Sequence, residues 1–491
     1  MKKLKKASIR IFLSLSILYL ILLIPDPKDT GNIIQSSKKS FEWNSDALWQ
    51  SLEKTFKAAK SDSPVTLSSS IAVLHSILNE KFTLLQTKNI TATDNDLQII
   101  ESAFFSLAPL VAAKQDSIPA FIDFYNQFRG YIKLQSQQWN MNDPASKNTI
   151  YSLLYGMRQA IEEVLLQADS KQFPSTMLVT AEKSNTPSTT IFGIEVHSGD
   201  MLVSRGGAEV SALISRGNDY PGNFSHVALI YIEEKTNKPY LIEAHIEKGV
   251  AVSSVDDYVK DKKLRFMVMR LRADHPAMKK DSMLPQKAAK QMYELALSKH
   301  IPYDFKMNYK DSSALFCSEV ASYGYRKNGI QLWKASSTIS SQGVVNWLHD
   351  FGVENFITQM PSDLEYDPQL AVVAEWRDPA TLYKDHIDNA VMDALLEKAN
   401  AGESIGYTIW QLPLVRIVKG YCWIKNLFGK EGIIPEGMSA TQALKNQTFV
   451  AMHISTKQKV EIDAENFVRQ NGYKPPYWQL VKFAEAAVSE K

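Results

Sequence analysis

The pattern of apolar positions changes its period near residue 190. From residue 43 to residue 168, apolar side chains recur every three or four residues, which is the spacing of helices with one buried face. One such stripe consists of Leu97, Ile100, Phe104, Leu107 and Val111. The last helix of the region begins at Asp143-Pro144, an N-cap residue followed by proline. About five helices of this kind predict an antiparallel bundle over residues 43–168.

Short runs of β-branched and aromatic residues follow a polar linker at residues 169–190. We expect strands at 200–203, 227–232, 240–243, 250–253 and 266–271, since turn residues separate these runs. A helix is expected over 285–300 and another over 318–328. Strands in succession with few helices between them predict an α+β domain with a small antiparallel sheet over residues 191–352.

Residues 353–491 read as a mixed, mainly helical C-terminal extension. Segments 366–368 and 375–379 are expected to open a helix that runs to about residue 400, and a final helix is expected over 477–488. The stretch 406–428 combines apolar and aromatic residues with several cations. It predicts an amphipathic helix packed on the protein, with contact to a membrane surface as the alternative.

The first residues resemble an export signal. Cations at Lys2, Lys3, Lys5, Lys6 and Arg10 precede an apolar run that stops at Pro25. The run is short for a spanning helix, which needs roughly 20 residues, but no cleavage site with small residues follows it. We therefore expect residues 1–25 to be an uncleaved membrane anchor, with a cleaved signal peptide as the alternative, and residues 26–42 to be a tether. Either way the body is exported to the cell envelope.

Composition narrows the function classes. The chain has 491 residues, with 45% hydrophobic and 22% charged residues, which is typical of a globular protein of several domains. A net charge of +2 argues against a nucleic-acid partner. The two cysteines form neither a disulfide framework nor a zinc-ribbon pattern, and no cofactor or metal is expected.

Cys317 stands where an apolar run meets the helix expected over 318–328. Free N–H groups and the positive end of the helix dipole lower a thiol pKa at this position, so Cys317 is a candidate nucleophile. A buried cysteine without function is the alternative. Cys422 has bulky apolar neighbours and is expected to be buried as a small hydrophobic residue.

A thiol nucleophile needs a base and a group that orients the base. His226 opens the strand-like run 226–230, where a rigid sheet edge would hold an imidazole. Glu243 lies on the next expected strand and can accept a hydrogen bond from that imidazole. His245 competes for the carboxylate, and a salt-bridged Glu243 is the structural alternative.

Five segments together resemble a known family. They are 198–203, 224–227, 241–244 with Gly249-Val250, 302–305 and 316–319. In this order they are similar to the permuted papain-like cysteine hydrolases of the NlpC superfamily, most closely the YiiX-like branch. The resemblance covers about residues 190–350, and 374–379 looks like an extension of it. It implies a circularly permuted papain-like core with Cys317 as nucleophile, His226 as base and Glu243 as the orienting residue.

The chemistry follows from that set of residues. Cys317 and His226 are expected to form a thiolate–imidazolium pair that attacks a carbonyl and passes through an acyl-enzyme. The resemblance implies a peptide or acyl-amide substrate, either a cell-wall peptide of peptidoglycan or a related γ-glutamyl or acyl-amino-acid linkage. A lipid acyltransferase or thioesterase on the same scaffold, and a binding module without turnover, stay open as alternatives.

Four further residues are candidates for substrate contacts. Tyr303 and Asp304 lie just upstream of Cys317, although a turn with a buried ring explains them equally well. Ser225 precedes the candidate base. Asp200 is expected to hold a turn at the start of the first strand, with a contact to a substrate ammonium group as the alternative.

Overall fold

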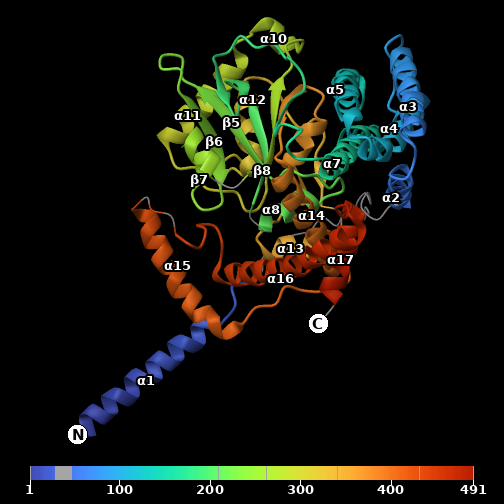
Figure 1. The fold of residues 1–491 in the computed structure, drawn as a ribbon. Helices are drawn as coiled ribbons and strands as arrows, with labels where there is room; N and C mark the ends of the chain where they lie inside the picture. The colour runs from blue at the N-terminus through green and yellow to red at the C-terminus, as the bar shows by residue number, and fades with distance from the viewer. Residues whose placement is uncertain are drawn as a thin grey trace.

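The computed structural model describes residues 2–27, 47–207, 209–260, 263–339, 341–428, 430 and 432–489. A helical bundle and a sheet domain lie side by side above a helical C-terminal region, and the first helix extends away from all three (Figure 1). The chain is 57% helical with an antiparallel sheet, so the predicted α+β class is confirmed.

The N-terminal bundle consists of five helical segments. They are α2 (Ala47–Ala59), α3 (Pro64–Leu85), α4 (Asn95–Ala113), α5 (Ile118–Gln135) and a last segment made of α6 (Pro144–Tyr151), a π-helical turn (Ser152–Gly156) and α7 (Met157–Gln167). The whole stripe that predicted α4, from Leu97 to Val111, is buried in the bundle core. Asp143 caps α6 by accepting a hydrogen bond from the N–H of Ala145.

One seven-stranded antiparallel sheet forms the centre of the second domain. Its strand order is β1-β11-β8-β4-β5-β6-β7. The strands are β1 (Thr176–Leu178), β4 (Met201–Gly206), β5 (His226–Ile232), β6 (Pro239–His245), β7 (Gly249–Ser254), β8 (Lys263–Leu271) and β11 (Leu370–Trp376). Two short pairs accompany the sheet: β2 (Ser188–Ile191) with β3 (Ile194–His197), and β9 (Ser337–Thr338) with β10 (Ile357–Thr358).

The sheet crosses both predicted domain borders. β11 pairs with β8 on one side and with β1 on the other, so strands from 353–491 and from 169–190 belong to the sheet. The prediction of a helix opening at 366–368 is wrong over 370–376, which form β11. All but the last residue of β11 are buried, so the strand has no alternation of apolar and polar residues that would distinguish it from a helix.

Helices cover one face of the sheet. α11 (Leu284–Ser298) and α12 (Cys317–Lys327) pack on β5 and β6, and Val320, Ala321 and Tyr325 of α12 join the buried cluster beneath them. Gly329, just after α12, has φ +79°, the left-handed conformation that ends a helix. Three short helices lie in the connections of this domain: α8 (Glu209–Arg216), α9 (Val255–Lys260) and α10 (Pro276–Lys280).

The C-terminal region is built from five helices. They are α13 (Gln342–Asp350), α14 (Pro379–Asn400), α15 (Leu412–Leu427), α16 (Ala440–Asn471) and α17 (Tyr477–Ser489). The long helix α16 was not predicted. Its buried positions include polar residues such as His453 and Thr456, which break the apolar stripe. A capping box of Ser439 with Gln442 and a left-handed Gly472 mark its ends.

Buried ion pairs join the bundle to the sheet domain. Glu162 on α7 accepts hydrogen bonds from Arg158, Arg265 on β8 and His386 on α14, and all four side chains are buried. Removing one partner of such a buried pair costs about 3–5 kcal/mol, because the other charge stays uncompensated. The bundle, the sheet and α14 therefore form one body at this seam.

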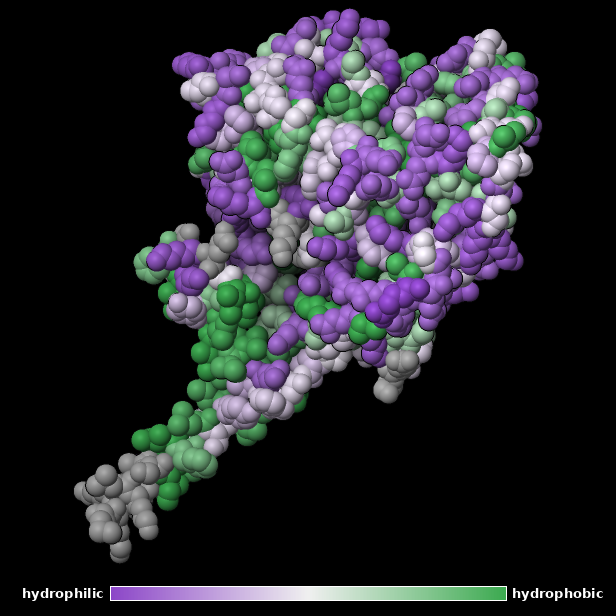
Figure 2. Space-filling model, viewed as in Figure 1, coloured by the Kyte–Doolittle hydropathy of each residue, from purple (hydrophilic) through white to green (hydrophobic). Residues whose placement is uncertain are grey.

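One helix of the described residues, Asn95–Ala113 (α4), is long and apolar enough to cross a membrane. More than half of it, 56%, is buried inside the bundle, as expected for a core helix. The first helix, α1 (Lys2–Leu22), contains a shorter apolar stretch, Ile9–Leu22. Figure 2 shows the hydrophobic surface of α1 projecting from the body of the protein.

Candidate active site

Cys317 is the first residue of α12. Hydrogen bonds hold the two residues before it: the N–H of Leu315 donates to the carbonyl of Pro302 (3.0 Å), and the N–H of Phe316 donates to Glu319 Oε2 (3.0 Å). The thiol is 4% exposed. Its Sγ donates to the carbonyl of Ser225 at 3.7 Å, directly before His226. The fold therefore brings the start of α12 to the start of β5.

His226 and Glu243 are in contact on neighbouring strands. Antiparallel pairing of β5 with β6 places them as diagonal neighbours on one face, where long side chains reach each other. His226 Nε2 lies 2.7 Å from Glu243 Oε2, so Nδ1 is the nitrogen left for other partners. Among the described contacts the sulfur bonds to the Ser225 carbonyl rather than to this imidazole.

His245 shares the same carboxylate. Its Nε2 lies 3.2 Å from Glu243 Oε1, and the two imidazole rings are 6.0 Å apart. Glu243 is buried, with 2% of its surface exposed, and its carboxylate contacts both imidazoles. Burial acts to raise the pKa of Glu243, but the hydrogen bonds from His226 and His245 outweigh it and hold the pKa well below its usual range.

The resting electrostatics differ from the expected thiolate–imidazolium pair. Burial raises the pKa of the Cys317 thiol to about 11, and the backbone N–H groups of Val227 and Ser318 offset only part of this effect. Burial also lowers the pKa of His226, against the opposing effect of Glu243. A neutral thiol beside a neutral imidazole follows, because desolvation is stronger here than the helix start.

Tyr303 lies beside the thiol, whereas Asp304 points into its own turn. The pKa of Tyr303 is raised well above its usual value, first by burial and then by the nearby Cys317. Asp304 accepts hydrogen bonds from the N–H groups of Lys306 (2.9 Å) and Asn308 (2.6 Å). It thereby holds a turn in which Met307 has φ +56°. Tyr303 remains a candidate lining residue, and the Asp304 carboxylate is occupied by the backbone.

Two serine hydroxyls at the site have no hydrogen-bond partner among the described residues. Ser225 Oγ and Ser318 Oγ are both buried and both unpartnered. Buried hydroxyls are normally paired, so these two are available to a ligand that enters the site. Ser225 was predicted as a substrate contact. Ser318 was missed, although its place directly after the candidate nucleophile was the available signal.

Asp200 lies at the other end of the strand pair. Met201 pairs with Leu229 and Ser204 pairs with His226, so Asp200 precedes β4 at the end remote from the imidazole. Both carboxylate oxygens bond to Arg270, at 2.8 and 2.7 Å. Asp200 Oδ2 also accepts from the N–H of His197 at 2.7 Å, so the placement favours the expected turn-holding role over the alternative of a substrate contact.

The order of the three side chains in the chain decides the type of core. The imidazole comes from β5 and the thiol from the later helix α12, which is the reverse of the order in an unpermuted papain-like chain. Residues 195–374 match the family of permuted papain-like amidase enzymes, YaeF/YiiX, C92 family. Residues 195–374 form a permuted papain-like amidase domain. The family, the fold class and the assignment as a cysteine amidase, all predicted from the sequence, are confirmed.

Comparisons with curated proteins and with solved structures gave no match. The amidase family match extends to residue 374, inside β11, and therefore includes the strand that the sequence had assigned to the C-terminal extension. Sheet pairing and family match agree on where this part of the domain ends.

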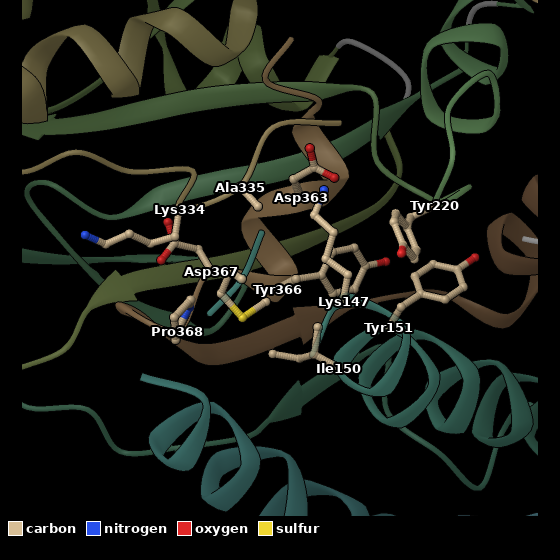
Figure 3. Close-up of a pocket in the computed structure, with 11 residues that line it drawn as sticks. Lys147, Ile150, Tyr151, Tyr220, Lys334, Ala335, Asp363, Tyr366, Asp367 and Pro368 are labelled. Atoms are coloured by element: carbon tan, nitrogen blue, oxygen red, sulfur yellow. The ribbon is translucent and has the colours of Figure 1, made fainter. Parts of the chain in front are cut away.

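A separate cavity lies at the seam between the bundle and the amidase domain. Lys147 and Tyr151 of α6 line it together with Tyr220, Asp363 and Tyr366, and none of the predicted site residues does (Figure 3). Its volume is about 30 Å³. Because its lining includes none of Cys317, His226 and Glu243, this cavity is not part of the candidate active site. Within the described ranges, no group of three His, Cys, Asp or Glu side chains is placed to hold a metal ion.

Proposed function

We propose that this protein is an exported, membrane-anchored cysteine amidase in which Cys317 is the nucleophile, His226 the general base and Glu243 the group that orients the base. The observation that carries the proposal is the 2.7 Å contact of His226 Nε2 with Glu243 at the strand start that also accepts the Cys317 thiol. That contact fixes the tautomer with a free Nδ1, the form needed to take a proton from sulfur.

The reaction starts from the neutral pair. As Sγ attacks the carbonyl carbon of an amide, the thiol proton moves to Nδ1 of His226, and the carbonyl electron pair moves to oxygen. The tetrahedral intermediate collapses, the C–N bond breaks, and the imidazolium gives its proton to the leaving amine. Water then attacks the thioester with His226 as base. This step releases the acid and restores the thiol.

Two features support stabilisation of the oxyanion. The N–H of Cys317 is at the first position of α12, where backbone donors lack partners within the helix and the dipole favours negative charge. Ser318 Oγ is buried and unpartnered beside it. A donor that waits for a developing charge is worth about 2.7–4 kcal/mol of transition-state stabilisation in acyl transfer.

The substrate we propose is an amide of a cell-wall peptide or a related γ-glutamyl or acyl-amino-acid linkage. The unpartnered hydroxyls of Ser225 and Ser318 favour a substrate with polar groups next to the scissile bond. A lipid acyl chain offers these two hydroxyls no polar group apart from the scissile carbonyl, whereas a peptide or acyl-amino-acid substrate carries further donors and acceptors. The amidase reading is therefore preferred to a lipid acyltransferase or thioesterase.

The location we propose is the cell envelope, with α1 as the anchor. The cations near the start of α1 and its apolar stretch Ile9–Leu22 support an orientation in which the N-terminus stays inside and the amidase domain is exported.

The test is a substrate panel on the full chain in detergent. Peptidoglycan stem peptides, γ-glutamyl anilides, N-acyl amino acids and lipid esters are incubated with the unchanged protein, with Cys317→Ala and with Cys422→Ala, and released acid and amine are measured. Cleavage of an amide that is lost in Cys317→Ala and kept in Cys422→Ala supports the proposal. Turnover of lipid esters alone would replace the substrate class, and amide cleavage that survives Cys317→Ala would overturn the nucleophile.

A further inference from the structure

An exposed apolar stripe runs along α15 and the residues at its two ends. The stripe consists of Trp410 in the preceding 3₁₀ turn (Ile409–Gln411), Leu414, Ile417, Tyr421 and Ile424 on α15, and Phe428 directly after the helix, spaced alternately by four and three residues. The least exposed member, Ile424, is still 49% exposed. Six large exposed apolar side chains along this helix and its two ends form a patch of a kind that soluble monomers rarely leave in water.

The opposite face of α15 is packed on the protein. Leu412 is fully buried against Ala440 and Leu444 of α16, and Cys422 is buried against Ile434 and Met438. The helix is therefore held in a defined orientation by its own core. Because α15 is apolar on both faces, one face serves the fold and the other needs a second partner.

The end of α1 is fixed to the start of α15. Arg416 donates to the carbonyls of Leu22 (3.0 Å) and Ile24 (2.6 Å) and to Asp26 Oδ1 (2.9 Å). Asp26 Oδ2 in turn accepts from the N–H (3.0 Å) and the hydroxyl (2.9 Å) of Thr441 at the start of α16. A cation on the last carbonyls of a helix satisfies them and offsets the helix dipole. The apolar surfaces of α1 and α15 consequently meet at one junction, as Figures 1 and 2 show.

We propose that α15 lies in the outer interface of the same bilayer that α1 enters, with the stripe from Trp410 to Phe428 among the lipid headgroups and upper acyl chains. At 1.5 Å per residue, the apolar stretch Ile9–Leu22 of α1 extends about 21 Å into the hydrocarbon core, which is about 30 Å thick, and the cations before it lie towards the inner surface. The junction with Arg416 then sits at the outer surface, which is where α15 begins. Trp410, Tyr421 and Trp423 are amphipathic rings of the type enriched at this level.

Charge at the far end of α15 suits the same occupant. Lys425 lies within the last turn of α15 and the exposed Lys430 follows the stripe, where lipid phosphates would meet them. A soluble protein partner or a second copy of this chain would explain the stripe of α15, but not its continuity with the apolar surface of α1. A bilayer explains both surfaces at once.

Two aromatic rings, Phe305 and Tyr303, connect the packing beneath α15 to the amidase site. Phe305 packs into the cluster of Cys422, Ile434 and Met438 beneath α15, and its ring lies 5.0 Å from that of Tyr303. Tyr303 in turn packs against the buried cluster that contains Cys317. A bilayer-bound α15 would therefore hold the active-site segment close to the membrane surface, and the inference predicts a substrate that is presented there. This inference rests on the proposed anchor α1 but not on catalysis.

The experiment places a fluorophore on the stripe of the full chain. In a Cys317→Ala background, Ile417→Cys on α15 and, as a matched control, Leu297→Cys on α11 are each labelled with bimane; Ile417 is 65% and Leu297 64% exposed. The labelled chains are reconstituted into phosphatidylcholine–phosphatidylglycerol vesicles. Quenching is measured with nitroxide-bearing lipid and with a water-soluble nitroxide. The background chain, with Cys422 buried, reports non-specific labelling.

We expect lipid nitroxide to quench the α15 probe at least about fivefold more than the α11 probe, and the soluble nitroxide to show the reverse order. An α15 probe quenched only from water would show a solvated stripe and overturn the inference. Protection from both quenchers would show a protein partner or a second copy in place of lipid. Chains that do not float with the vesicles would overturn the anchor itself, an outcome that leaves the amidase proposal standing.

Discussion

Cys317 and Cys422 are both buried thiols on helices, and their surroundings are opposite. Cys317 begins α12 next to the carbonyl of Ser225 and near the His226–Glu243 pair. Cys422 lies within α15 among Ile434 and Met438. Burial and helical context are therefore shared, and only the polar neighbours differ. The comparison shows that the candidate chemistry of Cys317 comes from the two strands that face it and not from the helix alone.

The packing around the two cysteines also differs. Around Cys422 the fit is tight, because a side chain at Gly432 would overlap the cysteine. Around Cys317 the hydroxyls of Ser225 and Ser318 are buried without partners, which is a cost to folding that a structural site has no reason to keep. The surroundings of Cys422 are filled by the protein itself, whereas those of Cys317 contain hydroxyl groups that a ligand can bind.

Exchanging each cysteine for alanine gives the largest contrast. We expect Cys317→Ala to lower kcat by about 10⁴-fold or more, since loss of a nucleophile removes the covalent pathway. Cys422→Ala should change kcat by less than about twofold and lower the free energy of unfolding by about 1–2 kcal/mol, as for a small cavity. Amide hydrolysis and urea unfolding of both variants measure this. Equal losses of activity would contradict the division between the two thiols.

Substitution of the two histidines that contact Glu243 should give the next largest difference in kcat. His226→Ala should lower kcat by about 10²–10⁴-fold, the range for a lost general base. His245→Ala should lower it by less than about tenfold, because His245 contacts the carboxylate and not the strand start that accepts the thiol. Steady-state kinetics on the same amide compares them. If His245→Ala were the more damaging change, the base would have been assigned to the wrong imidazole.

The carboxylate should act through the pH profile. Glu243 raises the pKa of His226 against the larger effect of burial, so Glu243→Gln should lower that pKa further and move the acid limb of kcat/KM to lower pH. The rate on the plateau should also fall by about 10–10²-fold, because the imidazole loses its tautomer control. A limb that moves to higher pH would show that Glu243 does not act on the base.

Ser318 should give the smallest effect. Ser318→Ala removes a hydroxyl that has no partner in the resting protein, so stability should stay within about 0.5 kcal/mol, while kcat/KM falls by about tenfold if the hydroxyl binds substrate or oxyanion. Ser322→Ala, one turn later on α12, is the matched control. No change in kcat/KM for Ser318→Ala would leave the oxyanion to the backbone N–H groups.

Local signals in the sequence were sufficient for most of the fold. Apolar stripes at helical spacing predicted the bundle, and runs of β-branched residues predicted β4 to β8. Segments whose burial comes from distant parts of the chain were missed. β11 is covered on both faces and has no alternation, and α16 buries His453 and Thr456 in place of an apolar stripe. The pairing of β1 with β11 and of β11 with β8 crosses the borders predicted at 190 and 352, and such non-local pairing leaves no local signal in the sequence.

The candidate site divides in the same way. Neighbouring strands and the helix start were enough to bring Cys317, His226 and Glu243 into one region. The neutral state of the thiol was not predictable, because desolvation depends on the chain that covers it. The bond of Asp200 to Arg270 and the turn held by Asp304 likewise depend on partners that sequence spacing does not reveal.

The pH dependence of thiol alkylation tests the central claim most directly. With a neutral thiol of pKa about 11 and His226 as base, modification of Cys317 by a chloroacetamide peptide should reach a plateau near neutral pH, set by the imidazole. In His226→Ala the rate should be much lower at pH 7 and rise about tenfold per pH unit towards the pKa of the thiol. Mass spectrometry of the Cys317 and Cys422 peptides gives both rates. Identical pH profiles of Cys317 in the unchanged protein and in His226→Ala would contradict the account.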